Sequence, residues 1–208
     1  AAEHSWNLLM ALSRKLPSAI QSVMNGNWSR QKFPGIMLNG KTLGIIGCGR
    51  IGKWMARYGF AFGMKVRGYD PYLDPWPDKI IKTSLDSIFS SSDFITIHVH
   101  LSEKTKNLVN EKHFKIVKPG SILINTSRGA IVDEQALLNA LKLGRLGGAG
   151  LDVLDGEPNI KNHPLLKYAR QNENLLITPH CGGYSPDALR LVCKRAFEKV
   201  LDHVNGDS

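Results

Sequence analysis

Three residues in the second half of the chain could together hold a carboxylate and move a proton. Arg128 lies in the segment 124–129, Glu157 in the segment 150–158 and His180 in the segment 178–183. An arginine offers a planar, bidentate fork to a carboxylate. A histidine can act as a general acid or base near neutral pH, and a neighbouring glutamate favours its charged form. These are the groups that hydride transfer to or from a 2-hydroxy acid requires.

Each of these residues also has an ordinary structural interpretation. A lone histidine at the end of an apolar strand is more often structural than catalytic, and Arg128 alone could form a surface ion pair. Cys181, next to His180, could be a redox switch or a small residue that lines a pocket. The three segments taken together, in their order and spacing, favour the catalytic hypothesis.

A glycine-rich turn in the first quarter of the chain could bind a dinucleotide. Gly47, Gly49 and Gly52 have GxGxxG spacing. In such a motif the glycines permit the tight turn, the approach of backbone to a pyrophosphate, and close packing of helix on strand. Asp70, roughly 20 residues further on, could bind the adenine ribose and would repel the 2′-phosphate of NADP. The pattern predicts an NAD site; the alternatives are FAD, or a plain turn with Asp70 as a surface carboxylate.

The elements that position these residues follow a regular alternation of short apolar strands and helices. The strands are predicted at 42–46, 65–69, 94–99, 121–125, 148–153 and 175–177, and the helices between them at 50–62, 85–89, 111–116 and 134–143. Strands that are apolar throughout and alternate with helices indicate a parallel sheet covered on both faces. We therefore predict an α/β, Rossmann-type doubly wound parallel sheet with helices on both faces.

The whole chain, 1–208, is predicted to form one domain of three parts. These are N-terminal helices within 1–40, a Rossmann core at 41–184 and a C-terminal helix at 185–206, in which Ser185 is the N-cap and Gly206 the stop. Apolar residues Trp6, Leu9, Leu12 and Leu16 are spaced along one helical face, which should be buried on the sheet or against a second copy. The prolines between Asp70 and Asp78 forbid a regular helix there.

Composition sets broad limits on function. The formal net charge is +9, but the 27 lysines and arginines are scattered, so neither a nucleic-acid nor a membrane partner is expected. No apolar run approaches the roughly 20 residues needed to cross a bilayer. The three cysteines lack metal-ligand spacing, so we expect no metal site and a reducing, cytoplasmic location.

The segments around Arg128, Glu157 and His180, together with the glycine turn, resemble the D-isomer-specific 2-hydroxyacid dehydrogenases, a family that includes phosphoglycerate dehydrogenases. The resemblance covers nearly the whole chain and implies an NAD-dependent oxidoreductase with Arg128, Glu157 and His180 as catalytic residues. It also implies a homodimer formed through the N-terminal region. The cofactor residues that the motif and the resemblance together predict are Gly47, Gly49, Arg50, Ile51, Gly52, Asp70, Val99, His100, Thr105, Thr126, Ser127, Arg128, Asp152, His180, Gly182 and Gly183.

The chain departs from the family pattern at two places. His100 stands where many members have proline, and the proline-rich stretch Asp70–Asp78 replaces a short helix. Glu157 argues against a formate dehydrogenase, whose pattern has an amide at that position.

Members of the family carry a second, substrate-binding domain, which we expect to be absent from this chain, so that the fragment alone should be inactive. The substrate is expected to be a small 2-hydroxy or 2-oxo acid, and resemblance around residues 25–30 and 38–44 favours D-3-phosphoglycerate. The alternative function is an NAD-sensing transcriptional co-repressor of the C-terminal-binding-protein type, which can retain the same three residues.

Overall fold

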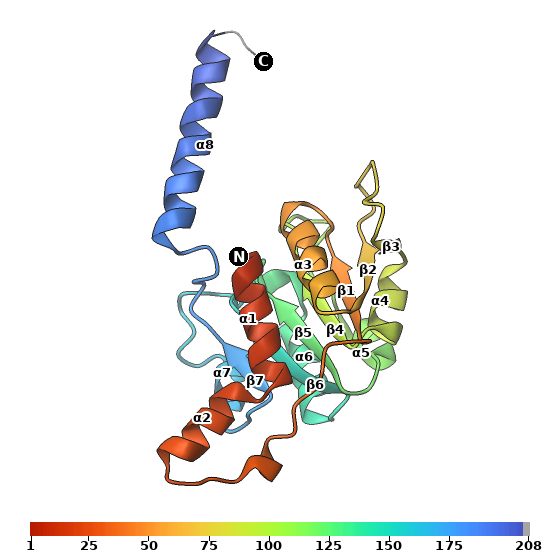
Figure 1. Cartoon of the computed structure of the whole chain (residues 1–208), viewed down its shortest axis with the longest axis vertical. Coiled ribbons are helices and arrows are strands. Elements are labelled where there is room, and N and C mark those ends of the chain that lie inside the picture. Colours follow the sequence, from red (N-terminus) through yellow and green to blue (C-terminus); the bar gives the residue numbers. More distant parts are fainter. Residues whose placement is uncertain (206–208) are drawn as a thin grey trace.

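A seven-stranded parallel sheet forms the centre of the computed structural model, which describes residues 1–205 (Figure 1). The strand order is β3-β2-β1-β4-β5-β6-β7, and every pairing is parallel. The strands are β1 (Thr42–Ile46), β2 (Lys65–Tyr69), β3 (Ile81–Lys82), β4 (Phe94–Ile97), β5 (Ser121–Asn125), β6 (Leu146–Leu151) and β7 (Leu175–Ile177). The predicted Rossmann-type fold is confirmed.

Helices cover both faces of the sheet. The helices of residues 1–205 are α1 (Ala2–Ser13), α2 (Leu16–Met24), α3 (Arg50–Ala61), α4 (Leu85–Ser91), α5 (Glu111–Ile116), α6 (Glu134–Lys142), α7 (Pro164–Ala169) and α8 (Pro186–Asn205), with 3-10 turns η1 (Arg30–Lys32) and η2 (Gly129–Ile131). Helices α1 and α3 pack on one face, and α4 to α7 on the other. Gly206, the predicted end of the last helix, lies outside the described residues.

The strands are apolar throughout because both sides of the sheet are covered. Along β4, Phe94 packs into the core beneath α1 and α3, whereas Ile95 packs into the core beneath α4 to α6, and neither is exposed. Side-chain caps begin the helices on the second face: Ser84, Asn110 and Asp133 each accept a hydrogen bond from a backbone N–H of the first turn.

The face of α1 that was predicted to be buried lies on the sheet. Trp6, Leu9 and Leu12 are buried there, and Trp6 also stacks on aromatic rings of the α3 region. Gly150 in β6 allows this approach, since a Cβ at that position would lie 3.1 Å from the Cβ of Leu8. The placement of Leu16 on this helix is wrong: α1 ends at Ser13, and Leu16 begins α2 and does not lie on the sheet.

Element boundaries agree closely with the predictions, with two omissions. Strand β4 ends at Ile97 rather than residue 99, and β6 runs from Leu146 to Leu151 rather than over 148–153. Strand β3 and helix α7 were not predicted from the sequence. The two residues of β3 are exposed at the sheet edge, and α7 has only six residues, so neither shows a clear apolar period.

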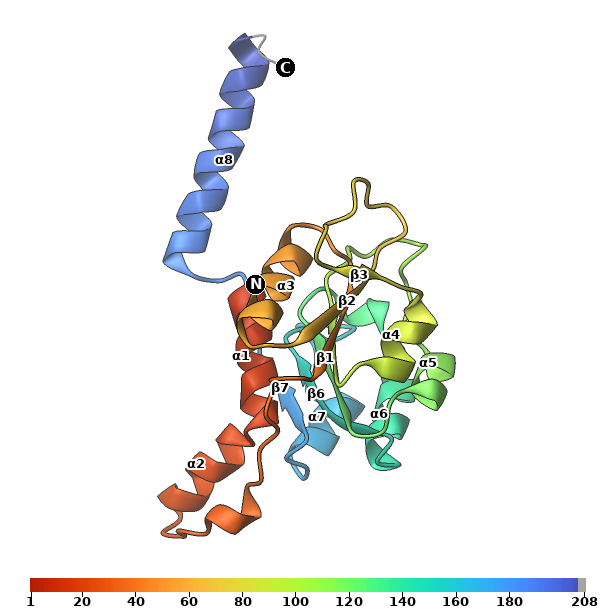
Figure 2. The same cartoon turned by 45° about the vertical axis from the view of Figure 1, so that its right-hand side comes forward.

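Two helices project from the sheet (Figures 1 and 2). Helix α8 extends away from the body of the domain and leaves Val192, Phe197 and Val200 exposed. Helix α2 projects near the opposite end of the molecule and exposes Ile20 and Met24. Among residues 1–205, no helix combines the length and the apolar character that crossing a bilayer requires.

Candidate active site

The glycine turn lies where the strand order reverses. Strand β1 has β2 on one side and β4 on the other, and ligands of doubly wound sheets bind at the carboxyl ends of such a pair. Gly47 follows β1 with a φ of +89°, in the left-handed region that favours glycine. A Cβ there would lie 2.6 Å from the carbonyl oxygen of His98, which follows β4. The turn therefore packs directly against the neighbouring strand end.

The other two glycines have different surroundings. A Cβ at Gly52 would overlap the carbonyl oxygen of Gly47, so helix α3 could not begin this close to the turn with any larger residue. Gly49 is the N-cap of α3, and a Cβ there would meet nothing within 4 Å. The turn thus leaves open space above the N-terminus of α3, where unpaired N–H groups favour an anion.

Asp70 follows β2, and its side chain binds the backbone of the glycine turn. Its carboxylate accepts hydrogen bonds from the backbone N–H of Cys48 at 3.0 Å and of Tyr72 at 3.1 Å. A carboxylate has further acceptor capacity, which leaves room for ribose hydroxyls. Burial, and next the charge of Asp70, raises the pKa of the Cys48 thiol to about 12. Cys48 is therefore an inert, protonated thiol in the core of the turn.

Seven of the predicted cofactor residues line one cleft of about 550 Å³ beside this turn: Arg50, Ile51, Val99, His100, Thr126, Ser127 and Arg128. Thr105 supports the rim of the cleft, since its hydroxyl donates to the carbonyl of His100 at 2.7 Å and accepts from the N–H of Ser102 at 2.8 Å. His98 also lines the cleft, and burial lowers its pKa to about 3, so it is neutral at physiological pH.

A network of hydrogen bonds holds the segment that carries Arg128. Asn125 accepts from the N–H of Ser127 and donates to the carbonyl of Arg128, both at 3.0 Å. A Cβ at Gly129 would overlap the backbone of Leu154 and its successor. The Arg128 turn is thereby pressed against the loop that leads to Glu157, while the guanidinium itself is exposed.

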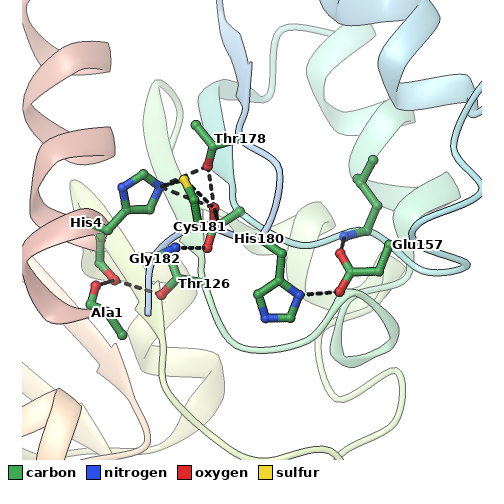
Figure 3. A network of polar contacts seen from close by, with 11 residues as sticks. Ala1, His4, Thr126, Glu157, Thr178, His180, Cys181 and Gly182 are labelled. Carbon is green, nitrogen blue, oxygen red and sulfur yellow. Dashed lines mark hydrogen bonds and ion pairs between the residues drawn. The ribbon is translucent and has the colours of Figure 1, made fainter. Parts of the chain in front are cut away.

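His180 and Glu157 form a contact pair. The Nδ1 atom of His180 lies 2.5 Å from Oε1 of Glu157, whose second oxygen accepts from the N–H of Leu154 at 3.2 Å (Figure 3). An ionised carboxylate only accepts, so Nδ1 carries the hydrogen and Nε2 faces away from the glutamate. His180 has a φ of +53°, an uncommon conformation for a non-glycine residue. Its N–H donates to the carbonyl of Asp152 at 2.9 Å.

A half-buried contact between Glu134 and His163 positions the Glu157 loop. Glu134, at the start of α6, accepts from the N–H of Asp155 at 2.9 Å and lies 2.9 Å from Nε2 of His163, the N-cap of α7. Burial raises the pKa of Glu134. Glu134 therefore contacts the loop between β6 and α7 near both of its ends, at Asp155 and at His163.

The pair lies on the wall of a second cavity, of about 510 Å³, that is distinct from the cleft lined by Arg128. Apart from Glu157, Thr178 and His180, it is lined by apolar side chains: Leu154, Pro158, Ile160, Leu166, Ile177 and Pro179. An apolar wall limits the access of water to one side of the imidazole. The described residues therefore place Arg128 and His180 in two separate depressions.

Asp152 is more enclosed than the sequence analysis anticipated. Only 1% of it is exposed, and both carboxylate oxygens already have protein donors. They are Thr178 Oγ1 at 2.6 Å and the N–H groups of Cys181 at 3.0 Å and Gly182 at 2.7 Å. His4 Nε2 lies 3.2 Å from Oδ1 of this carboxylate. Asp152 thus fixes the segment that follows β7. Gly183, next in that segment, is exposed, with open space where a Cβ would be.

The sequence analysis missed the contribution of α1 to the site. His4 contacts Asp152, and Ser5 Oγ lies 2.7 Å from the hydroxyl of Thr126, which lines the cleft of about 550 Å³. Ser5 is fully buried. Polar residues at the start of an otherwise apolar helix were the available signal, because a buried polar side chain needs a partner.

The family model described as "D-isomer specific 2-hydroxyacid dehydrogenase, NAD binding domain" matches residues 6–182. This chain belongs to that family. The matched segment is the family's NAD-binding domain, and NAD is its cofactor. The chain is 41% identical to D-3-phosphoglycerate dehydrogenase of Archaeoglobus fulgidus and 40% identical to that of Rattus norvegicus, over 99% and 100% of its length.

Solved structures share the fold of this chain. A D-lactate dehydrogenase from Aquifex aeolicus, complexed with NAD and lactic acid, superposes with a TM-score of 0.88 at 35% identity, over 99% of this chain and 66% of that one. An acyclic imino acid reductase in complex with NADPH and D-Arg superposes with a TM-score of 0.90 at 32% identity, over 99% of this chain and 64% of the other. The chain spans 39% of the length of the two curated relatives above.

Proposed function

We propose that this chain is the NAD-binding lobe of a dehydrogenase that interconverts 2-hydroxy and 2-oxo acids. The contact between His180 Nδ1 and Glu157 carries the proposal, because it orients the imidazole and leaves Nε2 free for a substrate hydroxyl. His180 gives or takes the proton at Nε2, and Glu157 stabilises the imidazolium. Arg128 holds the substrate carboxylate through its two-pronged guanidinium. The bound cofactor supplies or accepts the hydride.

The cofactor is proposed to lie along the carboxyl edge of the sheet. The open space above Gly49 and the N-terminus of α3 suit the pyrophosphate, and Asp70 suits the adenine ribose. The cleft from Arg50 to Arg128 suits the other half of the molecule. Gly182 and Gly183 form a small-residue wall that admits a flat ring, and Asp152 holds this wall in place.

The proposed substrate is D-3-phosphoglycerate, supported by the names of the curated relatives described above. The named relatives are dehydrogenases or a reductase, which favours the enzyme over a co-repressor. We place residues 1–208 in a larger protein whose other domain completes the substrate pocket, so this chain alone should bind NADH without turnover. The exposed apolar residues of α2 support a homodimer, and three unpaired cysteines support a cytoplasmic location.

The activity is tested in the complete protein by following NADH absorbance with a panel of 2-oxo acids. His180→Ala should lower kcat by about 10²- to 10⁴-fold, because a positioned acid/base is lost. Arg128→Lys should act mainly on KM, since an ammonium cannot reproduce the planar fork. His203→Ala on α8 is the matched control and should change nothing. Full activity in His180→Ala would disprove the assignment.

Cofactor preference is tested on this chain by calorimetric titration. NAD(H) should bind more tightly than NADP(H), because the Asp70 carboxylate opposes a 2′-phosphate. Asp70→Ala should narrow the difference between the two affinities, while Asp155→Ala, at an exposed aspartate, should leave it intact. Equal affinities for both cofactors in the unaltered chain would refute the role given to Asp70. The dimer is tested by sedimentation, where a monomer throughout the micromolar range would count against it.

A further inference from the structure

Three side chains of metal-ligating type meet beside the cofactor cleft, although they are far apart in the sequence. Asp152 follows β6. His4 lies on α1 and Cys181 follows β7 (Figure 3). His4 Nε2 lies 3.2 Å from Asp152 Oδ1 and 3.8 Å from Cys181 Sγ, and Cys181 Sγ lies 3.7 Å from Asp152 Oδ1. The cluster therefore presents one nitrogen, one oxygen and one sulfur atom toward a common point.

These separations are close to those of three corners of a zinc tetrahedron. Zinc bonds of about 2.0–2.1 Å to nitrogen and oxygen and about 2.3 Å to sulfur, at tetrahedral angles, put the nitrogen and oxygen about 3.3 Å apart. The same geometry puts the sulfur about 3.6 Å from each of them. The observed separations of 3.2, 3.8 and 3.7 Å differ from these by about 0.2 Å or less.

We propose that His4, Asp152 and Cys181 bind a zinc ion, with a fourth position open to water. Mixed imidazole, carboxylate and thiolate ligands suit zinc, whereas magnesium and calcium require an oxygen cage. The side chain of His4 is 21% exposed and Cys181 is half-buried, so an ion can reach the cluster from solvent. On binding, the thiol loses its proton to solvent as the zinc–sulfur bond forms. The neutral imidazole of His4 keeps its hydrogen at Nδ1, so that the lone pair of Nε2 binds zinc in place of its contact with Thr178 Oγ1 at 2.9 Å.

Neighbouring groups hold the ligands in place. Asp152 Oδ2 accepts from the N–H of Gly182 at 2.7 Å, and Oδ1 accepts from the N–H of Cys181 at 3.0 Å. Such partners orient the ligands of a metal site and strengthen binding. The Thr178 hydroxyl, 2.6 Å from Oδ1, gives up its hydrogen bond when zinc binds to that oxygen. The same contacts also describe a hydrogen-bonded cluster without metal, which is the alternative that the experiment must separate.

A bound zinc ion would reduce cofactor binding, a consequence that rests on the proposed function. The cluster adjoins the cleft, since Ser5, next to His4, contacts the cleft residue Thr126. The ion would sit against Gly182, in the small-residue wall proposed to admit the nicotinamide ring. Zinc would then act as a reversible inhibitor of NADH binding.

The site is tested on the reduced 208-residue chain by titration with cobalt(II), followed by displacement with zinc. One equivalent of cobalt should give a sulfur-to-metal charge-transfer band that zinc abolishes. Cys181→Ser and His4→Gln should each weaken zinc binding by more than about 100-fold, because loss of a ligand exceeds loss of a supporting contact. Cys193→Ser, at an exposed cysteine on α8, is the matched control and should bind as the unaltered chain does.

Absence of the band in the folded chain, or an unchanged band in Cys181→Ser, would overturn the proposal. Circular dichroism verifies that each variant is folded. In a parallel fluorescence titration, zinc should weaken NADH binding to the unaltered chain but not to Cys181→Ser. Zinc binding without this effect would refute the inhibition alone. Failure of NADH to bind in the absence of metal would refute the proposed function, while the cobalt band still decides the metal site.

Discussion

Replacing Asp152 by asparagine tests how the segment after β7 is held. The substitution preserves size and removes one acceptor oxygen. In the native chain Oδ1 accepts from Thr178 and from the N–H of Cys181, and Oδ2 accepts from the N–H of Gly182. The asparagine amide has one oxygen and one NH₂ group. In the orientation that keeps more hydrogen bonds, the asparagine oxygen takes the place of Oδ1. The NH₂ group then faces the N–H of Gly182.

The expected cost follows from that mismatch. One hydrogen bond to a charged acceptor is lost, and a donor is left opposite another donor, which together cost about 1.5–3 kcal/mol. We expect Asp152→Asn to lower the free energy of unfolding by about 2 kcal/mol. In a domain of this size that corresponds to a Tm lower by roughly 4–8 °C. The loss is a sizeable part of an ordinary folding free energy of about 5–15 kcal/mol.

Urea unfolding followed by far-UV circular dichroism measures this loss. Asp155→Asn is the matched control, because it is the same substitution at an exposed position three residues away, and it should remain within about 0.5 kcal/mol of the unaltered chain. NADH affinity should also fall in Asp152→Asn, since Gly182 loses its partner. A loss of less than about 0.5 kcal/mol in Asp152→Asn would show that the carboxylate does not hold this segment.

Three further predictions use other parts of the structure. Gly129→Ala should lower the free energy of unfolding by about 1–3 kcal/mol in urea melts, because its methyl group would overlap the backbone of the neighbouring loop; unchanged stability would contradict this. Burial lowers the pKa of His98 to about 3, against about 6.5 when unfolded, so the unfolded chain binds the proton first as the pH falls. The free energy of unfolding should therefore decline from about pH 6.5 toward pH 3, with this residue contributing up to about 1.4 kcal/mol per pH unit. His98→Gln should make that decline with pH less steep. If the free energy of unfolding depends on pH equally in the variant and in the unaltered chain, His98 does not have this effect. In the native chain an alkylating reagent should modify Cys193 rapidly and Cys48 only after denaturation, as mass spectrometry of the labelled peptides would show, since Cys193 is exposed and burial keeps Cys48 protonated.

The order of strands and helices could be predicted because its signals are local. Apolar runs, capping residues and glycine stops lie within a few residues of the boundaries that they determine, and β1, β2, β5 and β7 have the predicted limits. The error at Leu16 has a different origin. The period of α1 continues to that residue in the sequence, but the chain changes direction after Ser13, and where it turns depends on packing against the sheet.

The candidate site also has one part that local sequence predicts and another part that depends on tertiary packing. The glycine turn and the approach of Glu157 to His180 were predictable, because the motif is contiguous and the carboxyl ends of parallel strands share one edge. Nothing in the local sequence links His4 to Asp152 or to Cys181. Their contact requires α1 to lie across β5 and β6, and that position depends on the burial of a whole helix face and on small residues in the strand beneath it. Local sequence therefore determined the elements and the residues at their ends, while the tertiary packing of α1 on the sheet decided which distant side chains share a site.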